Sequence, residues 1–262
     1  MSILEALILG ILQGATEFLP VSSSGHLVIG QALMDIEIPG VSFEVAVHVA
    51  TLLSVLLVYR TRISELLLGV VRRDKGAWRY VGLLLIATIP AAVVGVGAGD
   101  LIEGLFDSPW VAGGALLVTG TFLWSARGAL KRNPSQPPGL VAAVLIGFAQ
   151  AVAIVPGISR SGATVVVALW LGIEAEEAAA FSFLMAVPAI LGAAVLELPS
   201  LAESGMGISS GALLVGGLAA AITGVLAIWT FVALLKKRAF HRFGPYCWAV
   251  GAAFLLFLGF AG

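Results

Sequence analysis

A carboxylate lies within apolar sequence near the start of the chain, in residues 13–26, which we call the first motif. Gln13 and Glu17 are four residues apart, so they share one face of a helix. Pro20 is expected to end that helix, because it has no N–H to donate and restricts the residue before it. A carboxylate in apolar surroundings is costly unless it is paired or solvated, which makes Glu17 a functional candidate. The alternative is a structural carboxylate that pairs with Arg160.

Hydroxyl groups and a histidine follow the predicted helix break of the first motif. Serine side chains at such a position can cap the next helix and point their hydroxyls at a ligand. The residues of this group are Ser22, Ser23, Ser24, Gly25 and His26. We therefore expect all five residues to lie at the site.

The second motif, residues 156–164, has the composition of an anion site. Arg160 supplies a permanent positive charge whose planar fork suits phosphate oxygens. A hydroxyl-rich turn that opens a helix also exposes free backbone amides, which bind anions. The glycines and hydroxyl residues of this motif are Gly157, Ser159, Ser161, Gly162 and Thr164. Together the two motifs offer an acid/base half and an anion-binding half, and a polar hinge without a ligand is the alternative.

The composition indicates that a membrane surrounds these polar motifs. Of the 262 residues, 60% are hydrophobic and only 11% are charged, whereas soluble domains carry about 25% charged residues. Four long apolar segments approach or reach the length that spans a bilayer, about 20 residues. These segments are 80–97, 111–126, 211–235 and 245–261. We therefore expect an all-α integral membrane protein with one membrane domain, residues 1–262.

Basic residues cluster in three linkers between the apolar segments. The linkers hold 13 of the 14 Lys and Arg, namely Arg60, Arg62, Arg72, Arg73, Lys75, Arg79, Arg127, Lys131, Arg132, Lys236, Lys237, Arg238 and Arg242. The positive-inside rule places all three linkers in the cytoplasm. A nucleic-acid surface is the competing interpretation, and it is disfavoured because the linkers flank membrane spans. The one basic residue outside the linkers is Arg160.

Two regions, residues 2–34 and 139–174, do not fit simple membrane spans. Each contains two apolar stretches separated by Pro, Gly and Ser, and neither stretch is long enough to span comfortably at 1.5 Å per residue. Each region is better interpreted as a re-entrant hairpin, the first entering from outside and the second from the cytoplasm. Irregular backbone at membrane depth needs protein or a water-filled cavity around it. The two hairpin tips should therefore be buried, and we expect them to meet.

The two halves of the chain resemble each other. The matched stretches, each pair 137 residues apart, are Gly10–Gln13 with Gly147–Gln150 and Ser22–Gly25 with Ser159–Gly162. The halves, about 1–126 and 139–262, are each expected to hold one re-entrant hairpin and about three transmembrane helices. The cytoplasmic linker 127–138 joins them, and their orientations in the membrane are opposite. Such an inverted repeat places its site at the midplane, where broken helices meet.

At these motifs the chain resembles the undecaprenyl-pyrophosphate phosphatase family, also called the bacitracin-resistance proteins. The stretches that carry the resemblance are QGATEFLPVSSSGH (13–26), FEVAVHVATLLSVLLVYR (43–60), PGISRSGAT (156–164) and FSFLMAVPAILGA (181–193). The resemblance covers nearly the whole chain. Members of this family carry Glu or Gln at the first acidic position. That position is Gln13 here, which leaves Glu17 as the only carboxylate of the pair.

The resemblance implies a phosphatase in the plasma membrane. Water would cleave undecaprenyl diphosphate, or a similar polyprenyl diphosphate, into the monophosphate and inorganic phosphate, which recycles the carrier lipid for cell-envelope glycan synthesis. The site is expected to open to the extracytoplasmic side. A divalent cation, Mg²⁺ or Ca²⁺, is implied as well, with Glu17 as its expected ligand. The expected partners are the lipid diphosphate and membrane lipids, without nucleic acid, and a homodimer is left open.

Two catalytic routes remain open. We expect Arg160 to grip the diphosphate, because charge stabilisation at the transferring phosphoryl group is usually the dominant catalytic effect. Gln13 and the serines, threonine and glycines of both motifs are expected to bind the same group. In one route Ser23 attacks, activated by Glu17 or His26 as the base. In the other, Glu17 and a metal ion activate water. His26 either protonates the departing phosphate or caps its helix.

A transporter or flippase of a phosphorylated polyprenyl lipid is the main alternative function, since inverted repeats with broken helices are typical of transporters. The cluster of hydroxyls and arginine beside Glu17 favours phosphoryl chemistry instead. A scaffold protein is the third interpretation, and it does not explain why Glu17 and Arg160 are present in apolar sequence.

Glu44 and His48 share a helix face in the segment that follows the first motif. They either line the entrance of the site or form an ordinary interhelical hydrogen bond.

Overall fold

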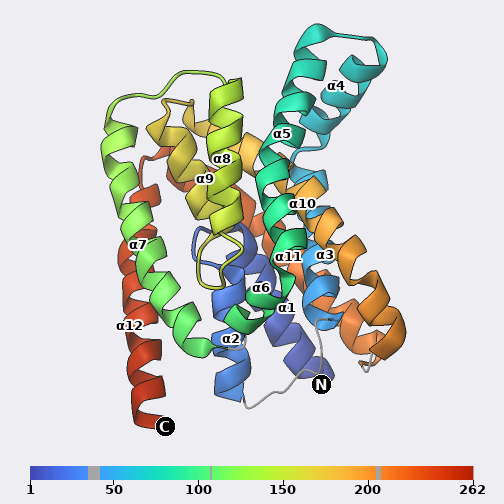
Figure 1. The fold of residues 1–262 in the computed structure, drawn as a ribbon, viewed down its shortest axis with the longest axis vertical. Helices are drawn as coiled ribbons and strands as arrows, with labels where there is room; N and C mark the ends of the chain where they lie inside the picture. Colours follow the sequence, from blue (N-terminus) through green and yellow to red (C-terminus); the bar gives the residue numbers. More distant parts are fainter. Residues whose placement is uncertain (35–41, 107, 205–207, 262) are drawn as a thin grey trace.

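The computed structural model is helical (Figure 1), and it describes residues 1–34, 42–106, 108–204 and 208–261. The helices are α1 (Ile3–Phe18), α2 (Ser23–Met34), α3 (Ser42–Val58), α4 (Arg60–Val71), α5 (Lys75–Gly97), α6 (Gly99–Phe106), α7 (Pro109–Lys131), α8 (Leu140–Val152), α9 (Arg160–Trp170), α10 (Ala175–Ser204), α11 (Ser210–Lys236), the 3-10 helix η1 (Phe240–Arg242) and α12 (Phe243–Ala261). No β-strand forms within these ranges. The predicted all-α class is confirmed.

Several helices are suited to cross a membrane. Four stretches within the described residues are long and apolar enough, namely Lys75–Gly97, Ala175–Leu196, Ser210–Lys236 and Phe240–Phe260. A fifth forms if α3 and α4, whose segments Val45–Val58 and Arg60–Val71 meet at 80°, are one broken span. The protein is therefore a multi-pass membrane protein. The sequence predicts six spans, but α7, which contains the predicted segment 111–126, is not among the apolar stretches because glycine and threonine dilute its apolar residues.

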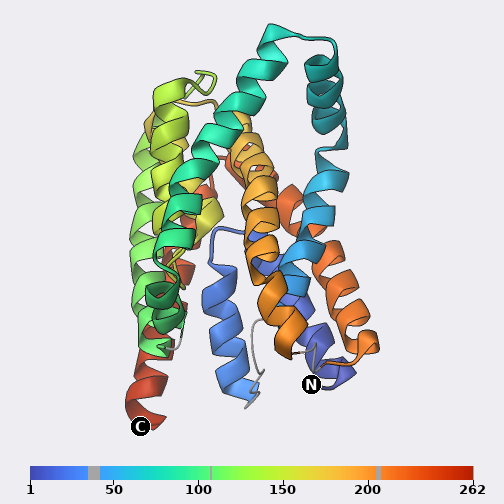
Figure 2. The same cartoon turned by 45° about the vertical axis from the view of Figure 1, so that its right-hand side comes forward.

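At each of the two motifs, an irregular segment separates two short helices. Residues 19–22 form the first tip, between α1 and α2, and residues 153–159 form the second tip, between α8 and α9. The 16 residues of α1 extend about 24 Å, short of the bilayer core of about 30 Å. The tips lie side by side in both views (Figures 1 and 2), and the Ser161 hydroxyl donates to the Leu19 carbonyl at 3.3 Å. The prediction that the tips meet is confirmed.

The local sequence explains both breaks. Pro20 follows the last turn of α1, where its missing N–H and its ring prevent the helix from continuing. In the second tip, Gly157 has a φ of +93°, a backbone conformation that favours glycine. Ser159 then starts α9, because its hydroxyl accepts from the Gly162 N–H at 3.1 Å as an N-cap.

Small residues bring the helices of the two halves into close contact. α1 packs on α11, α8 packs on α5, and α7 packs on α12. A Cβ atom at Gly10 would lie 2.2 Å from the carbonyl oxygen of Gly216 on α11, and one at Gly147 would lie 2.6 Å from that of Ala87 on α5. Only glycine therefore fits at these two crossings, as expected for membrane helices that associate through close backbone packing.

A column of aromatic rings fills the space between the first tip and the third basic linker. Ring centroids of Phe18 and Phe183 are 5.5 Å apart, those of Phe183 and Phe231 are 5.0 Å apart, and those of Phe231 and Phe240 are 5.3 Å apart. All four side chains are fully buried. The column thus connects this linker to Phe18, the neighbour of Glu17, through a continuous series of ring contacts.

The crossing of α7 and α12 offers a test of this packing. A Cβ atom at Gly120 would lie 2.7 Å from the Gly244 carbonyl oxygen and 2.5 Å from the Trp248 ring, whereas one at Gly114 on the same helix meets nothing within 4 Å. Gly120→Ala should therefore cost about 1–3 kcal/mol through overpacking. Gly114→Ala should be neutral or stabilising, by up to about 1 kcal/mol. Thermal unfolding of both variants in detergent checks this, and equal midpoints would contradict the packing.

Candidate active site

The centre of the site is an ion pair between the two halves of the chain. Glu17 lies in the last turn of α1, and Arg160 is the first residue of α9. The Arg160 Nη2 atom lies 2.5 Å from Glu17 Oε1, and the side chains are 16% and 6% exposed. Both charges are thus largely withdrawn from solvent, and each is the other's main compensation. The structure confirms the predicted contact between the two motifs.

Three further side chains converge on the other oxygen of Glu17. Ser23 donates its hydroxyl to Glu17 Oε2 at 2.6 Å, and Gln13 donates its amide N–H to the same atom at 3.1 Å. His48 of α3 places its Nε2 atom 3.5 Å away. A serine hydroxyl bonded to a carboxylate has the geometry of a nucleophile with its general base. Of the two bases considered for Ser23, the geometry favours Glu17.

His26 is directed elsewhere. Its Nδ1 atom lies 2.9 Å from the carbonyl oxygen of Ser22 and its Nε2 atom lies 2.9 Å from the Tyr246 hydroxyl of α12. A carbonyl oxygen only accepts, so Nδ1 carries a proton, and in the neutral imidazole Nε2 then accepts from the tyrosine. These bonds lead away from Ser23. No sequence signal distinguished Tyr246 from an ordinary aromatic residue of a membrane helix.

The remaining residues of the first motif shape the turn after Pro20. Ser22 has a φ of 68°, and its hydroxyl accepts from the Gly25 N–H at 3.3 Å and lies 3.3 Å from the Ser24 hydroxyl. A Cβ atom at Gly25 would lie 3.1 Å from the Gly157 Cα atom. These residues therefore let the tips approach each other, and their contact with a ligand stays a prediction.

The hydroxyls of the second motif bond within the protein. Ser159 and Ser161 lie 3.3 Å apart, oxygen to oxygen, and Thr164 donates to the Arg160 carbonyl at 2.8 Å. The Thr164 hydroxyl also lies 2.7 Å from that of Ser182 on α10. All these side chains are buried. Their geometry orients the start of α9, and direct contact with phosphate stays a prediction for Ser159, Ser161, Gly162 and Thr164.

Two residues outside the motifs complete the surroundings of the ion pair. Ser182 accepts a second Arg160 N–H, from Nη1, on its backbone carbonyl at 3.4 Å. His48 approaches Glu17 from α3, a contact that agrees with both alternatives for this residue, the lining of an entrance and an interhelical hydrogen bond. The side chain of Glu44 is outside the described residues. Ser182 could not be found by spacing, because it lies in an apolar stretch with no other polar neighbour.

The site has oxygen atoms that suit a hard cation, although few of them. Among the described residues, no three His, Cys, Asp or Glu side chains gather as a metal cage would require. Glu17 supplies the carboxylate found at the site among those residues, and the Gln13 Oε1 atom beside it is buried without a hydrogen-bond partner. Mg²⁺ is often held by one or two carboxylates and by substrate phosphates. The residues therefore fit a cation that is held mainly by a diphosphate.

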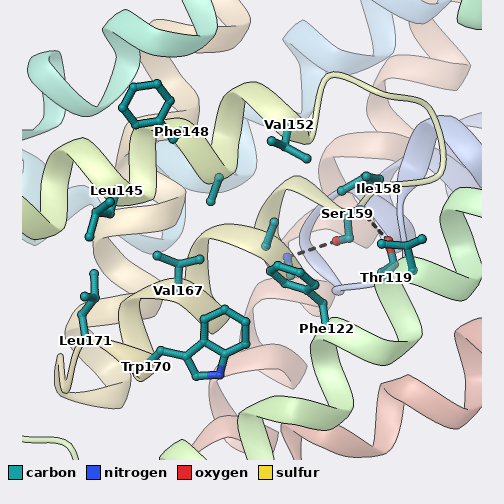
Figure 3. A pocket seen from close by; sticks show the side chains of 14 residues that line it. Thr119, Phe122, Leu145, Phe148, Val152, Ile158, Ser159, Val167, Trp170 and Leu171 are labelled. Carbon is teal, nitrogen blue, oxygen red and sulfur yellow. Dashed lines mark hydrogen bonds between the residues drawn. The ribbon is translucent and has the colours of Figure 1, made fainter.

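An apolar groove lies beside the second motif (Figure 3). It has a volume of about 390 Å³ and runs between α7, α8 and α9, with Phe148, Phe122 and Trp170 on its walls. Ser159 and Gly162 reach its inner end, whereas Arg160 and Thr164 contact α1 and α10 instead. The groove is therefore not the site of the ion pair.

Comparisons with known proteins place the chain among membrane phosphatases. The family model described as bacitracin resistance protein BacA matches residues 6–253. A protein of Desulforapulum autotrophicum named undecaprenyl-diphosphatase is 41% identical over 96% of both chains. Proteins of the same name from Alkaliphilus metalliredigens and Rubrobacter xylanophilus are each 40% identical, over 98% and 96% of this chain and 99% and 97% of their own.

The ion pair can be tested by a double-mutant cycle. Glu17→Gln and Arg160→Gln each leave a buried charge unpaired, so each should lower the free energy of unfolding, by up to about 3–5 kcal/mol. The loss of unfolding free energy in the double variant should be about 1–3 kcal/mol smaller than the sum of the two single losses. The free energies of unfolding of the wild type and the three variants are measured in detergent.

The pair Arg62–Glu177 is the matched control for this cycle. Its side chains are 39% and 34% exposed, and Nη2 lies 3.2 Å from Oε1. The coupling energy of this exposed pair should stay below about 1 kcal/mol. Additive effects at Glu17 and Arg160 would mean that the two do not interact in the folded protein.

Proposed function

The chain belongs to the family of bacitracin resistance proteins and is a membrane phosphatase of undecaprenyl diphosphate, and we propose that Glu17, Ser23 and Arg160 form its active site. The observation that carries the proposal is the convergence of both motifs on one carboxylate, at the only place where the two tips bring opposite charges together among the described residues. The products are undecaprenyl monophosphate and inorganic phosphate. The transporter alternative is not favoured, because the relatives carry the name of a diphosphatase.

Arg160 binds the diphosphate in this proposal. A guanidinium has five N–H donors, and Arg160 uses Nη2 toward Glu17 and Nη1 toward Ser182. The other donors suit the oxygens of the terminal phosphoryl group, whose negative charge spreads outward in the transition state. Because the guanidinium is already held in place, little reorganisation is needed when charge develops.

Ser23 is the proposed nucleophile. Its Oγ atom attacks the terminal phosphorus while Glu17 Oε2, 2.6 Å away, takes the hydroxyl proton. The bond between that phosphorus and the bridging oxygen breaks, and undecaprenyl monophosphate leaves with the bonding electrons. The departing monophosphate takes the proton from Glu17. Water then attacks the phosphoserine with Glu17 again as the base, the bond from phosphorus to Ser23 Oγ breaks, and Oγ takes the proton back from Glu17 as phosphate leaves. Direct attack by water, with Glu17 as base, is the second route, and the short contact between Ser23 and Glu17 favours the first.

A divalent cation fits this proposal through oxygen ligands. Glu17 and the Gln13 amide oxygen would hold it from the protein, and the diphosphate would supply the remaining oxygens. When bound, Mg²⁺ or Ca²⁺ neutralises phosphate charge and so stabilises the transition state. The role of Gln13 is then to add a neutral oxygen where some family members have a second carboxylate.

The other motif residues frame the phosphate site. Ser22, Ser24 and Gly25 hold the first tip, and Gly157, Ser159, Ser161, Gly162 and Thr164 hold the second. His26 supports the turn in this proposal, because its two ring nitrogens bond to the Ser22 carbonyl and the Tyr246 hydroxyl. Its role as a proton donor stays a prediction.

The site opens toward the extracytoplasmic side in this proposal. Phe18, Phe183, Phe231 and Phe240 pack between the end of α1 and the basic linker that the charge pattern assigns to the cytoplasm, which supports an opening on the other side. His48, which lies 3.5 Å from Glu17, is partly exposed. Membrane lipids surround the outer helix faces, and a homodimer stays a prediction.

The domain is further proposed to be an inverted repeat, with halves about 1–126 and 139–262 around the linker 127–138. One support is a reciprocal glycine pattern. A Cβ atom at Gly251 would lie 2.9 Å from the Gly113 carbonyl oxygen, and one at Gly244 would lie 2.8 Å from that of Gly120. Both glycine pairs have a spacing of seven residues, as expected for two helices packed antiparallel, an arrangement that a twofold relation between α7 and α12 would give. The pairing of α1 with α11 and of α8 with α5 follows the same relation.

The role of Arg160 can be tested with two arginine variants. Arg160→Ala should lower the release of phosphate from undecaprenyl diphosphate by about 10³-fold or more. Arg62→Ala, which removes a different ion-paired arginine, should leave the rate near that of the wild type. Purified proteins with matched elution profiles are compared in detergent. Comparable turnover by Arg160→Ala would refute the proposed site.

The nucleophile can be tested with substrate labelled in its terminal phosphate. If Ser23 attacks, Ser23→Ala should lower turnover by about 10³-fold or more, and an acid quench of the wild type should trap label on Ser23. Ser64→Ala, whose hydroxyl bonds only to the Thr61 carbonyl of its own helix among the described contacts, is the control. Turnover close to the wild-type rate in Ser23→Ala would instead assign the attack to water.

A further inference from the structure

A hydroxyl outside both motifs holds the second tip. Thr119 lies in the middle of α7, buried at the inner end of the apolar groove in Figure 3. Its hydroxyl donates to the Gly157 carbonyl oxygen at 2.8 Å and accepts from the Ser159 N–H at 3.1 Å. One side chain therefore bonds to the backbone on both sides of Ile158.

These two bonds involve the Gly157 carbonyl and the Ser159 N–H, whereas the N–H groups of Ile154, Val155 and Ile158 bond to carbonyls three residues earlier. The tip is irregular, with Gly157 at a φ of +93°, and both Gly157 and Ser159 are buried. Backbone polar groups at such a depth must be satisfied by the protein. Thr119 uses its single donor and an acceptor lone pair for this purpose.

The face of α7 that carries Thr119 also determines how closely the second tip packs against this helix. A Cβ atom at Gly157 would lie 2.3 Å from the Ala112 carbonyl oxygen and 2.8 Å from the Ala115 Cβ atom. Ala112, Ala115 and Thr119 follow one another at helical spacing, so they form one face. The tip is thus pressed against α7, and Thr119 is the residue of that face that bonds to it.

We infer that Thr119 is a positioning residue for Arg160, which rests on the proposed role of Arg160 in binding the diphosphate. Ser159, whose N–H the threonine holds, is the N-cap of α9, and Arg160 is the next residue. The direction in which α9 leaves the tip, and with it the guanidinium, therefore depends on the threonine hydroxyl. Thr119 itself acts through the backbone and does not touch Glu17 in the described contacts.

Thr121 provides a matched control two residues away. Its hydroxyl donates to the Leu117 carbonyl of its own helix at 3.0 Å and accepts from the Trp248 indole. It belongs to the same helix and has the same chemistry, but it makes no described bond to the second tip. A loss of function caused by any threonine change in α7 would affect both positions.

The test compares Thr119→Val, Thr119→Ser and Thr121→Val in phosphate release from undecaprenyl diphosphate. Valine keeps the shape and removes the hydroxyl, so kcat/KM of Thr119→Val should fall about 10- to 100-fold, as expected when a reactive group is misplaced by about 1 Å. Serine keeps the hydroxyl and should retain most of the activity. Thr121→Val should match the wild type. A role in packing alone predicts the reverse order, with valine active and serine impaired.

Two further measurements keep the outcome decisive. Thermal unfolding of each variant separates loss of fold from loss of orientation, and if Thr119→Val does not fold, Thr119→Ser and Thr119→Ala are compared because they differ only in the hydroxyl. Arg160→Ala is assayed in parallel. An active Arg160→Ala would overturn the proposed site itself. An inactive Arg160→Ala with a fully active Thr119→Val, or fully active Thr119→Ala, would overturn only the inference about Thr119.

Discussion

The ion pair between Glu17 and Arg160 is the interaction on which the rest of the structure depends. An unpaired charge at membrane depth is costly, so each of these residues requires the other. They lie 143 positions apart in the chain, at the ends of different broken helices. The pair can form only if the two tips meet, and the tips can meet only if glycine lines the crossings that bring the halves together. The architecture thus follows from the need to neutralise two charges within apolar surroundings.

The broken helices create a second need, because their ends carry backbone groups without helical partners. Side chains satisfy these groups at both tips. Ser159 caps α9, Ser22 accepts from the Gly25 N–H, and Thr119 bonds to the second tip from a neighbouring helix. Many hydroxyls of the motifs therefore form hydrogen bonds to backbone groups. This leaves a small number of groups for chemistry, chiefly the carboxylate, the guanidinium and the Ser23 hydroxyl.

The arrangement has a direct consequence for phosphoryl transfer. Arg160 is oriented by Glu17 and by the Ser182 carbonyl, and Ser23 already shares a hydrogen bond with the carboxylate. A site whose polar groups are held in advance needs little rearrangement as charge develops. Phe18, which follows Glu17 in the chain, is held by its ring contact with Phe183. The same ion pair that stabilises the fold therefore also prepares the groups proposed for catalysis.

Sequence alone determined the membrane class and located the two motifs, and it predicted a functional role for Glu17 and Arg160, because composition, helical spacing and the cost of a buried charge are local properties. The meeting of the tips also followed, since irregular backbone must be enclosed. Only the tertiary structure decided that His26 turns to Tyr246, that Glu17 rather than His26 contacts Ser23, and that the second-motif hydroxyls bond inward. It also decided that the Thr119 hydroxyl bonds to the backbone of the second tip. These are contacts between distant segments, and the rotation and packing of whole helices select which side chains face each other.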